Sequence, residues 1–218
     1  MNTDIVTHVE KKGRKFLVTV NEEHHLTVPY SIFQQRPLDI NDPLNLEEYE
    51  QWLMVRQFKY AFNQAVAFLA QRARSEKEVY DKVIRIGSLP QTAQMVVYKL
   101  KDLSLLDDYD FALQWIESRH RRQIGKYKIQ EELFKKGISK SIMEKAFLAA
   151  TPYEDASFEE EDLELHKALA QGEKLFLRYQ KEPKEKQKQK LLHGLVRKGF
   201  SWEVAKTALL QIIQEDET

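Results

Sequence analysis

The residues of this sequence best suited to binding a partner are its lysines and arginines, which gather in a few segments. Residues 118–122 read Ser-Arg-His-Arg-Arg, so Arg119, Arg121 and Arg122 stand together. The lysines that follow them closely are Lys126, Lys128, Lys135, Lys136 and Lys140. Guanidinium and ammonium groups bind phosphates and carboxylates, so this composition suits DNA phosphates or an acidic protein surface. We predict a binding role for the cluster as a whole, whereas any single lysine is better explained as a solvated side chain.

Residues suited to catalysis or metal binding lack the patterns that such chemistry needs. The sequence contains no G-x-x-x-x-G-K-[ST], G-x-G-x-x-G, H-E-x-x-H or G-x-S-x-G motif, and it has no cysteine. His24 and His25 are neighbours in a predicted strand and so point to opposite faces, which favours solvent-facing side chains over a metal site. Asp107 and Asp108 suit a helix start better than acid–base chemistry, because no partner base is evident. We therefore expect no enzyme activity, no cofactor and no metal.

The overall composition favours a folded and mainly helical protein. The chain has 218 residues, of which 42% are hydrophobic, and only seven glycines and six prolines. Its 34 basic and 34 acidic residues cancel, but the signs are segregated, with acids concentrated in residues 154–164 and 215–217. No apolar run approaches the roughly 18 residues of a membrane span, and no signal peptide is recognisable. A chain without cysteine suits a reducing compartment, so we expect a cytoplasmic protein without membrane contact.

The elements that must position the basic residues repeat along the chain. Aligning Gly87, Gly137 and Gly199 brings residues that are apolar in nearly every copy into register eight, four and three positions before each glycine, and five, six, nine and ten after it; Thr92 is the exception. The residues before the glycines are Val79, Val83 and Ile84; Ile129, Leu133 and Phe134; and Leu191, Leu195 and Val196. This spacing marks one face of a helix, and a glycine at its end predicts a left-handed C-terminal cap.

Each unit therefore contains a helix, a glycine stop and a second helix, with another helix upstream. The glycines stand 50 and then 62 residues apart, which indicates a longer, acidic insertion before the last copy. We expect three tandem three-helix repeats that form an elongated, curved array. The predicted segments are 1–48 for an N-terminal β element and linker, 49–106 and 107–152 for two repeats, and 153–218 for an acidic linker and the third repeat.

The N-terminal segment has a different pattern. Residues 5–9, 16–20 and 24–28 are rich in β-branched and apolar residues, and a charged turn containing Gly13 separates the first two. This pattern predicts a hairpin or a three-stranded sheet that must pack on helices to be stable. Pro37 and Pro43 are expected to bracket a loop, after which the helical period begins at Asn45.

Other helix signals fix the remaining elements. Ser75 and Glu78 have the spacing of a capping box. Phe111 and Trp115 are four residues apart, which is core spacing, and Trp202 is expected to pack against the preceding repeat. Exposed aromatic platforms for nucleic-acid stacking are not required by any of these patterns.

Three segments resemble the bacterial RecX regulatory proteins. Residues 72–79 are similar to the family's R-x-R-S-x-x-E-L/V segment, and Leu106 to Arg119 is similar to its L-D-D-x-x-F/Y-A-x-x-W-x-x-x-R signature. Residues 125–138 resemble its G-x-x-K-I-x-x-E-L-x-x-K-G-I segment. The sequence differs in two places: Lys126 stands where a proline often follows the glycine, and Ser104 stands where a glycine commonly precedes L-D-D.

The resemblance implies a regulator that binds the RecA recombinase filament and limits its activity without catalysis. Arg72 and Arg74 of the first matching segment then join the candidate binding residues. We expect a monomer whose partner is a RecA-type filament, with weak binding to single- or double-stranded DNA. Two alternatives are a stand-alone DNA-binding module, which zero net charge disfavours, and a helical scaffold for another protein.

Overall fold

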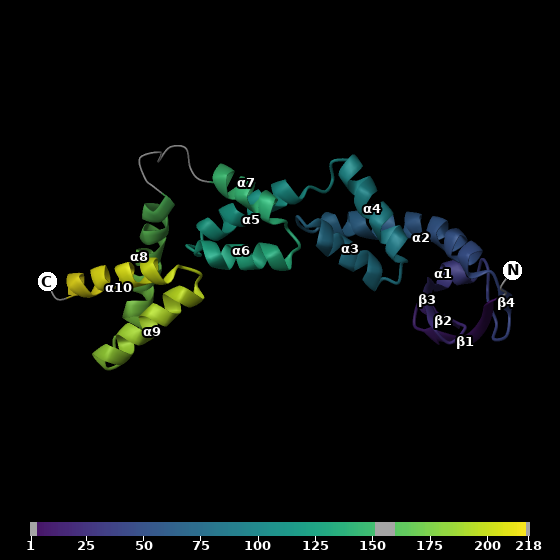
Figure 1. The fold of residues 1–218 in the computed structure, drawn as a ribbon, viewed down its shortest axis with the longest axis horizontal. Helices are drawn as coiled ribbons and strands as arrows, with labels where there is room; N and C mark the ends of the chain where they lie inside the picture. The colour runs from purple at the N-terminus through teal and green to yellow at the C-terminus, as the bar shows by residue number, and fades with distance from the viewer. Residues whose placement is uncertain (1–3, 151–159, 217–218) are drawn as a thin grey trace. The chain divides into compact units, whose positions relative to one another are not determined.

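The structure is a computed structural model that describes residues 4–150 and 160–216 (Figure 1). It divides into two compact units with the boundary between Asp107 and Asp108. The first unit contains a sheet and three long helices, and the second contains six helices in the described residues. A mostly helical fold with tandem three-helix repeats and a small N-terminal sheet is therefore confirmed.

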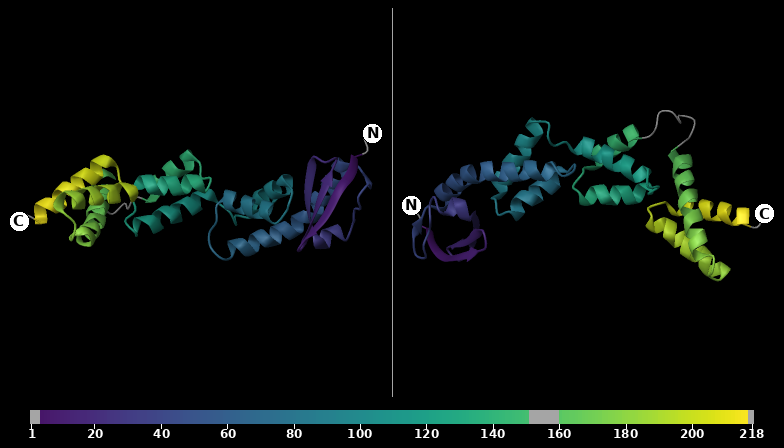
Figure 2. Two further views of the ribbon diagram at one scale, coloured as in Figure 1. Left: turned by 90° about the horizontal axis from the view of Figure 1, so that it is seen from below. Right: turned by 180° about the vertical axis from the view of Figure 1, so that it is seen from behind.

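The sheet at the start of the first unit is antiparallel, with strand order β3-β2-β1-β4 in the described residues (Figures 1 and 2). Its strands are β1 (Asp4–Lys12), β2 (Lys15–Val20), β3 (His24–Pro29) and β4 (Pro43–Leu44). Gly13 takes a φ of 62° in the turn between β1 and β2, as its position in the sequence predicts. One face of the sheet packs on the short helix α1 (Tyr30–Phe33) and on Tyr49 and Leu53 of α2 (Leu46–Leu69).

The fourth strand corrects the sequence interpretation, which placed Pro37 to Pro43 in a loop and expected at most three strands. The amide of Val6 donates to the carbonyl of Asp42 at 3.1 Å, and the amide of Asn41 donates to the carbonyl of Val6 at 2.8 Å. Pro43 then pairs with β1 at the edge of the sheet, where its missing N–H leaves no ladder bond broken.

Each group of three helices packs around a core of its own. The helix α2 contributes to two cores, because its first half covers the sheet and its second half packs in the first repeat. The other helices are α3 (Glu76–Arg85) and α4 (Pro90–Asp102); α5 (Asp108–His120), α6 (Lys126–Lys135) and α7 (Lys140–Ala150); and α8 (Glu160–Tyr179), α9 (Lys184–Arg197) and α10 (Trp202–Asp216). The capping box at Ser75 is present, with both reciprocal hydrogen bonds between Ser75 and Glu78.

The three aligned glycines end α3, α6 and α9 as predicted. Gly87, Gly137 and Gly199 have φ values of 96°, 82° and 93°. In each case the amide of the next residue donates to the carbonyl four positions before the glycine, at 3.3, 3.1 and 3.4 Å. This is the hydrogen bond of a Schellman cap, which requires a left-handed residue. Ser104, which replaces a glycine of the family pattern, also takes a positive φ, of 54°.

Two expectations about apolar residues are wrong. The apolar spacing predicts that the residue three positions before the glycine lies on the core face, but Phe134 is 74% exposed and Val196 is also exposed, and only Ile84 packs on its core. The sequence also predicts that Trp202 packs on the preceding repeat, but its side chain is 52% exposed. In all three repeats the residues four and eight positions before the glycine already fill the core side of the helix, so the next residue points away from it.

The acidic insertion is only partly described. Residues 151–159 and 217–218 lie outside the described residues, so the predicted acidic linker is not assigned a structure. Its last residues belong to the first turn of α8.

Candidate functional site

The ten candidate basic residues occupy three different environments. Arg72 and Arg74 belong to the first unit and the other eight to the second, and each group is described by itself. Some of the ten hold the fold together, some are paired on the surface of a helix, and two are exposed and form no ion pair with any residue that the structure describes. The last of these environments is the one that leaves a cation available to a binding partner.

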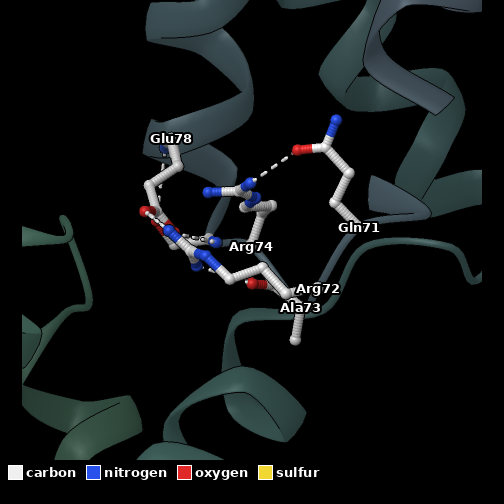
Figure 3. Close-up of polar contacts among 6 residues, drawn as sticks. Gln71, Arg72, Ala73, Arg74 and Glu78 are labelled. Carbon is white, nitrogen blue, oxygen red and sulfur yellow. Dashed lines mark hydrogen bonds and ion pairs between the residues drawn. The ribbon is translucent and has the colours of Figure 1, made fainter. Parts of the chain in front are cut away.

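Arg72 and Arg74 fasten the segment between α2 and α3 (Figure 3). The guanidinium of Arg72 donates to both carboxylate oxygens of Glu78, at 2.8 and 3.4 Å, and to the carbonyl of Ala73 at 2.8 Å. Arg74 lies 3.7 Å from the ring centroid of Phe68 and donates to Gln71 at 3.4 Å. Burial, followed by the charge of Arg72, lowers the pKa of Arg74. Both arginines therefore have structural roles in the folded chain.

Arg119 and Lys136 hold Trp115 in place in the second repeat. The Nε of Arg119 donates to Glu132 at 2.6 Å, and the indole N–H of Trp115 donates to the same carboxylate oxygen at 3.0 Å. The Arg119 guanidinium lies 4.1 Å from the Trp115 ring centroid, and the Lys136 Nζ lies 4.4 Å from it. Phe111 stacks on Trp115 and is buried, so the predicted core role of this aromatic pair is confirmed.

The lysines on α6 and α7 are paired on the helix surface. Glu131 accepts hydrogen bonds from Lys128 at 2.7 Å and from Lys135 at 2.5 Å. These two bonds lower the pKa of Glu131 to about 2, and the bond to Glu131 raises the pKa of Lys128. Lys140 pairs more loosely with Glu144, at 3.8 Å. Exposed pairs of this kind are weak, so a partner with a stronger anionic group can displace them.

Lys126 lies where the second and third repeats meet. Its amide donates to Glu164 of α8 at 3.1 Å, and its Nζ lies 5.6 Å from the Phe147 ring centroid. A proline at this position, which the family pattern often has, would lose the hydrogen bond to Glu164. The backbones of Gly125 and Gly199 touch beside it, with the Gly125 amide bonded to the Lys198 carbonyl at 3.0 Å.

Arg121 and Arg122 are the two candidates that remain exposed with no ion pair to a described residue. They lie in the turn that ends α5, where Gln123 takes a left-handed φ of 55°. The α8 helix holds this turn: Gln171 donates to the Arg122 carbonyl at 3.2 Å and to the Gln123 side chain at 3.1 Å. The third repeat therefore holds the backbone of the turn that carries both arginines.

Sequence reasoning missed Lys174, which this arrangement brings to the same turn. Its Nζ donates to the Gln123 side-chain oxygen at 2.9 Å, although the two residues are 51 positions apart. No local spacing predicts such a contact. The candidate binding site that the structure supports best is thus the α5–α6 turn with Arg121 and Arg122, extended by Lys174 of α8.

Metal-ligand clusters and membrane-spanning helices are both absent from the described residues. Within residues 4–150 and 160–216, no group of three or more histidines and acids is placed to hold a metal ion. None of the helices in these ranges has the length and apolarity that crossing a lipid bilayer requires.

Two protein-family models match the helical repeats of this chain. The model of the second three-helix domain of RecX matches residues 107–146, and that of the third three-helix domain of RecX matches residues 161–209. A solved chain described as a crystal structure of regulatory protein RecX superposes with a TM-score of 0.61 at 21% identity, covering 94% of this chain and 98% of the other. RecX from Lactobacillus salivarius gives a TM-score of 0.60 at 25% identity, over 73% of this chain and 99% of that chain.

Curated relatives extend the match to nearly the whole chain. The regulatory protein RecX of Streptococcus gordonii is 30% identical over 97% of this chain and 79% of its own length. The regulatory protein RecX of Listeria innocua is 28% identical over 94% of this chain and 74% of its own length. Since the family models, relatives that match nearly the whole chain and the fold all agree, the chain belongs to the RecX family of regulatory proteins.

Proposed function

We propose that this chain binds the filament of a RecA-type recombinase and lowers its recombination and ATPase activity, with no catalytic chemistry of its own, in the cytoplasm. Membership of the RecX family carries this proposal. The three-helix repeats support it, because separate repeats can contact separate protomers of one filament. Each contact then acts at the high effective concentration set by the others, so weak sites together give useful affinity.

The exposed α5–α6 turn is the proposed contact for an anionic surface of that filament. Arg121 and Arg122 are anchored through their backbone and keep their side chains in solvent, so binding them requires little rearrangement of the protein. The paired lysines Lys128, Lys135 and Lys140 can add to the contact once their pairs with Glu131 and Glu144 are exchanged.

Co-sedimentation with preformed recombinase filaments tests the proposal, with naked single-stranded DNA as the control and ATP turnover as a second readout. The expected result is sedimentation with filaments, much weaker binding to naked DNA and slower ATP turnover. Equal binding to naked DNA would favour a stand-alone DNA-binding module. No binding to either would favour a scaffold for another protein.

A further inference from the structure

The third helix of every repeat exposes one large apolar side chain at the same position. Eleven residues after the repeat glycine stand Tyr98 in α4, Leu148 in α7 and Leu210 in α10. Their exposed fractions are 71%, 79% and 52%. An isolated exposed leucine is ordinary on a protein surface. An exposed apolar side chain that recurs at the same position of three repeats is unusual and calls for an explanation. Core packing does not provide one, because it requires none of these side chains.

The same helices show that position eleven is separate from the core face. The residues nine positions after the glycines, Val96, Ala146 and Ala208, are completely buried. The apolar stripe of the third helix is thus complete without position eleven. We call Tyr98, Leu148 and Leu210 the third-helix apolar residues.

Each third-helix apolar residue has a lysine one helical turn away on the same helix. These lysines are Lys101, Lys145 and Lys206, and all three are exposed. Lys101 pairs with Glu76 at 2.7 Å, whereas Lys145 and Lys206 form no ion pair with any residue in the described part of the chain. In the second and third repeats the apolar side chain therefore lies beside a cation with no ion pair to the described residues, whereas in the first repeat the cation is paired with Glu76. Asp102 and Glu144 also lie one turn from Tyr98 and Leu148, but they pair with Lys99 and Lys140. This arrangement complements an apolar pocket rimmed by carboxylates.

This chemistry fits a protein better than a nucleic acid. Two of the three residues are leucines, which lack the π face on which a base stacks. One cation per repeat is also a poor match to the closely spaced phosphates of a nucleic acid. A partner that offers the same pocket several times would satisfy all three repeats.

We propose that the third-helix apolar residues dock into equivalent apolar, acid-rimmed pockets on different protomers of a protein polymer. This inference rests on the proposed function, in which the polymer is the recombinase filament. The third-helix apolar residues form a contact surface that is distinct from the α5–α6 turn. In each repeat, the face that carries this residue is the one that contacts the partner.

The test uses the full chain and replaces Tyr98, Leu148 and Leu210 by glutamine, singly and together. Glutamine keeps the helix propensity, so the melting temperature should not change. Binding to preformed filaments should weaken about tenfold for each substitution, as expected for losing a buried leucine-sized contact. The control variant carries Val55→Gln and Leu177→Gln, which alter apolar residues on α2 and α8 that are 66% and 64% exposed. It should bind as tightly as the wild type.

The outcomes separate this inference from the proposed function. If the wild type does not sediment with filaments, the proposed function fails and takes the inference with it. If the wild type binds and the triple variant binds equally well, only the inference is overturned. An equal loss in the control variant would also overturn it, because the effect would then be general surface apolarity. A parallel loss of binding to naked single-stranded DNA would assign the face to nucleic acid and overturn it as well.

Discussion

Arg119 and Arg121 are two positions apart in the sequence and have opposite roles in the structure. Arg119 shares the Glu132 carboxylate with Trp115 and is mostly covered, whereas Arg121 is exposed. Replacing Arg119 would leave a partly buried carboxylate without its cation, which is a stability effect. A loss of partner binding after mutation of Arg119 would therefore not identify a contact. Arg121 and Arg122 are the residues at which binding can be tested without disturbing the fold.

We predict that the variant Arg121→Glu with Arg122→Glu loses inhibition of recombinase ATP turnover while keeping its melting temperature. Reversing both charges should weaken filament binding about tenfold or more, because attraction to an anionic surface becomes repulsion. Arg56→Glu with Lys59→Glu makes the same change of net charge on exposed residues of α2 and serves as the control. Unchanged inhibition with unchanged melting would remove the α5–α6 turn from the interface.

Tyr49 provides a residue-scale prediction about pH. Its hydroxyl is buried and has no hydrogen-bond partner among the described residues, and burial raises its pKa to about 12, against a smaller opposing effect of Arg36. An unfolded tyrosine ionises near pH 10, so the unfolded state loses its proton first and stability falls as the pH rises from about 10 towards 12. Tyr49→Phe should remove that part of the alkaline loss. At neutral pH it should be neutral or stabilising by up to about 1 kcal/mol, since the unpaired hydroxyl is gone.

Urea unfolding of wild type and Tyr49→Phe at pH 7 and above pH 10 measures both effects. A loss of stability in the variant at pH 7 would mean that the hydroxyl makes a favourable contact in the folded chain.

At the scale of the elements, the glycines that end α3, α6 and α9 have two structural roles. Each allows a helix to end in a left-handed residue, and two of them also allow close packing. A Cβ at Gly87 would lie 2.3 Å from the Thr27 side chain of β3, and one at Gly199 would lie 2.4 Å from the Lys128 amide. Gly87 thus also lets the end of α3 pack against the sheet, and Gly199 lets the end of α9 pack against the second repeat.

We therefore predict that Gly199→Ala costs clearly more stability than Gly13→Ala. Both residues have positive φ, which costs a non-glycine residue about 1 kcal/mol. Gly13 has open space around its Cα, so that backbone cost is all that its variant should show. Gly199→Ala adds a clash with the backbone of α6. Chemical denaturation of the two variants compares them directly, and equal losses would argue against close packing at Gly199.

At the scale of the whole molecule, two buried glutamines join neighbouring modules. Gln57 of α2 donates to the carbonyls of Thr27 and Gly87 and accepts from the Leu89 amide, so it links the sheet to the first repeat. Gln171 links the third repeat to the α5–α6 turn of the second. Each glutamine lies within one of the two compact units.

We predict that Gln57→Ala destabilises the first unit by about 2–4 kcal/mol, because it leaves buried backbone groups unpaired and opens a cavity. Residue-resolved hydrogen exchange should be faster than in the wild type for amides up to Asp107 and unchanged for amides from Asp108 onward. Gln171→Ala is the matched control, and it should speed exchange in the residues from Asp108 onward and leave exchange before Asp108 unchanged. Equal acceleration in both units would mean that the chain unfolds as one cooperative body.

The sequence alone determined the repeat architecture. The helices, the capping box at Ser75 and the left-handed Gly87, Gly137 and Gly199 were all predictable. These features depend on residues within one or two helical turns, where apolar spacing and backbone conformation act directly. The resemblance of residues 72–138 to one family could be recognised for the same reason, since its motifs are local.

Only the tertiary structure decided which of the predicted residues are available to a partner. The sequence placed ten basic residues in one candidate set, but Arg119 and Lys136 pack on Trp115, while Arg121 and Arg122 stay exposed on a turn held by Gln171. It also could not predict the β4 strand or the exposure of Trp202. Burial and pairing depend on residues that folding brings together from distant positions, such as Gln123 and Lys174, which are 51 residues apart. The spacing of residues within one helix contains no information about such a contact.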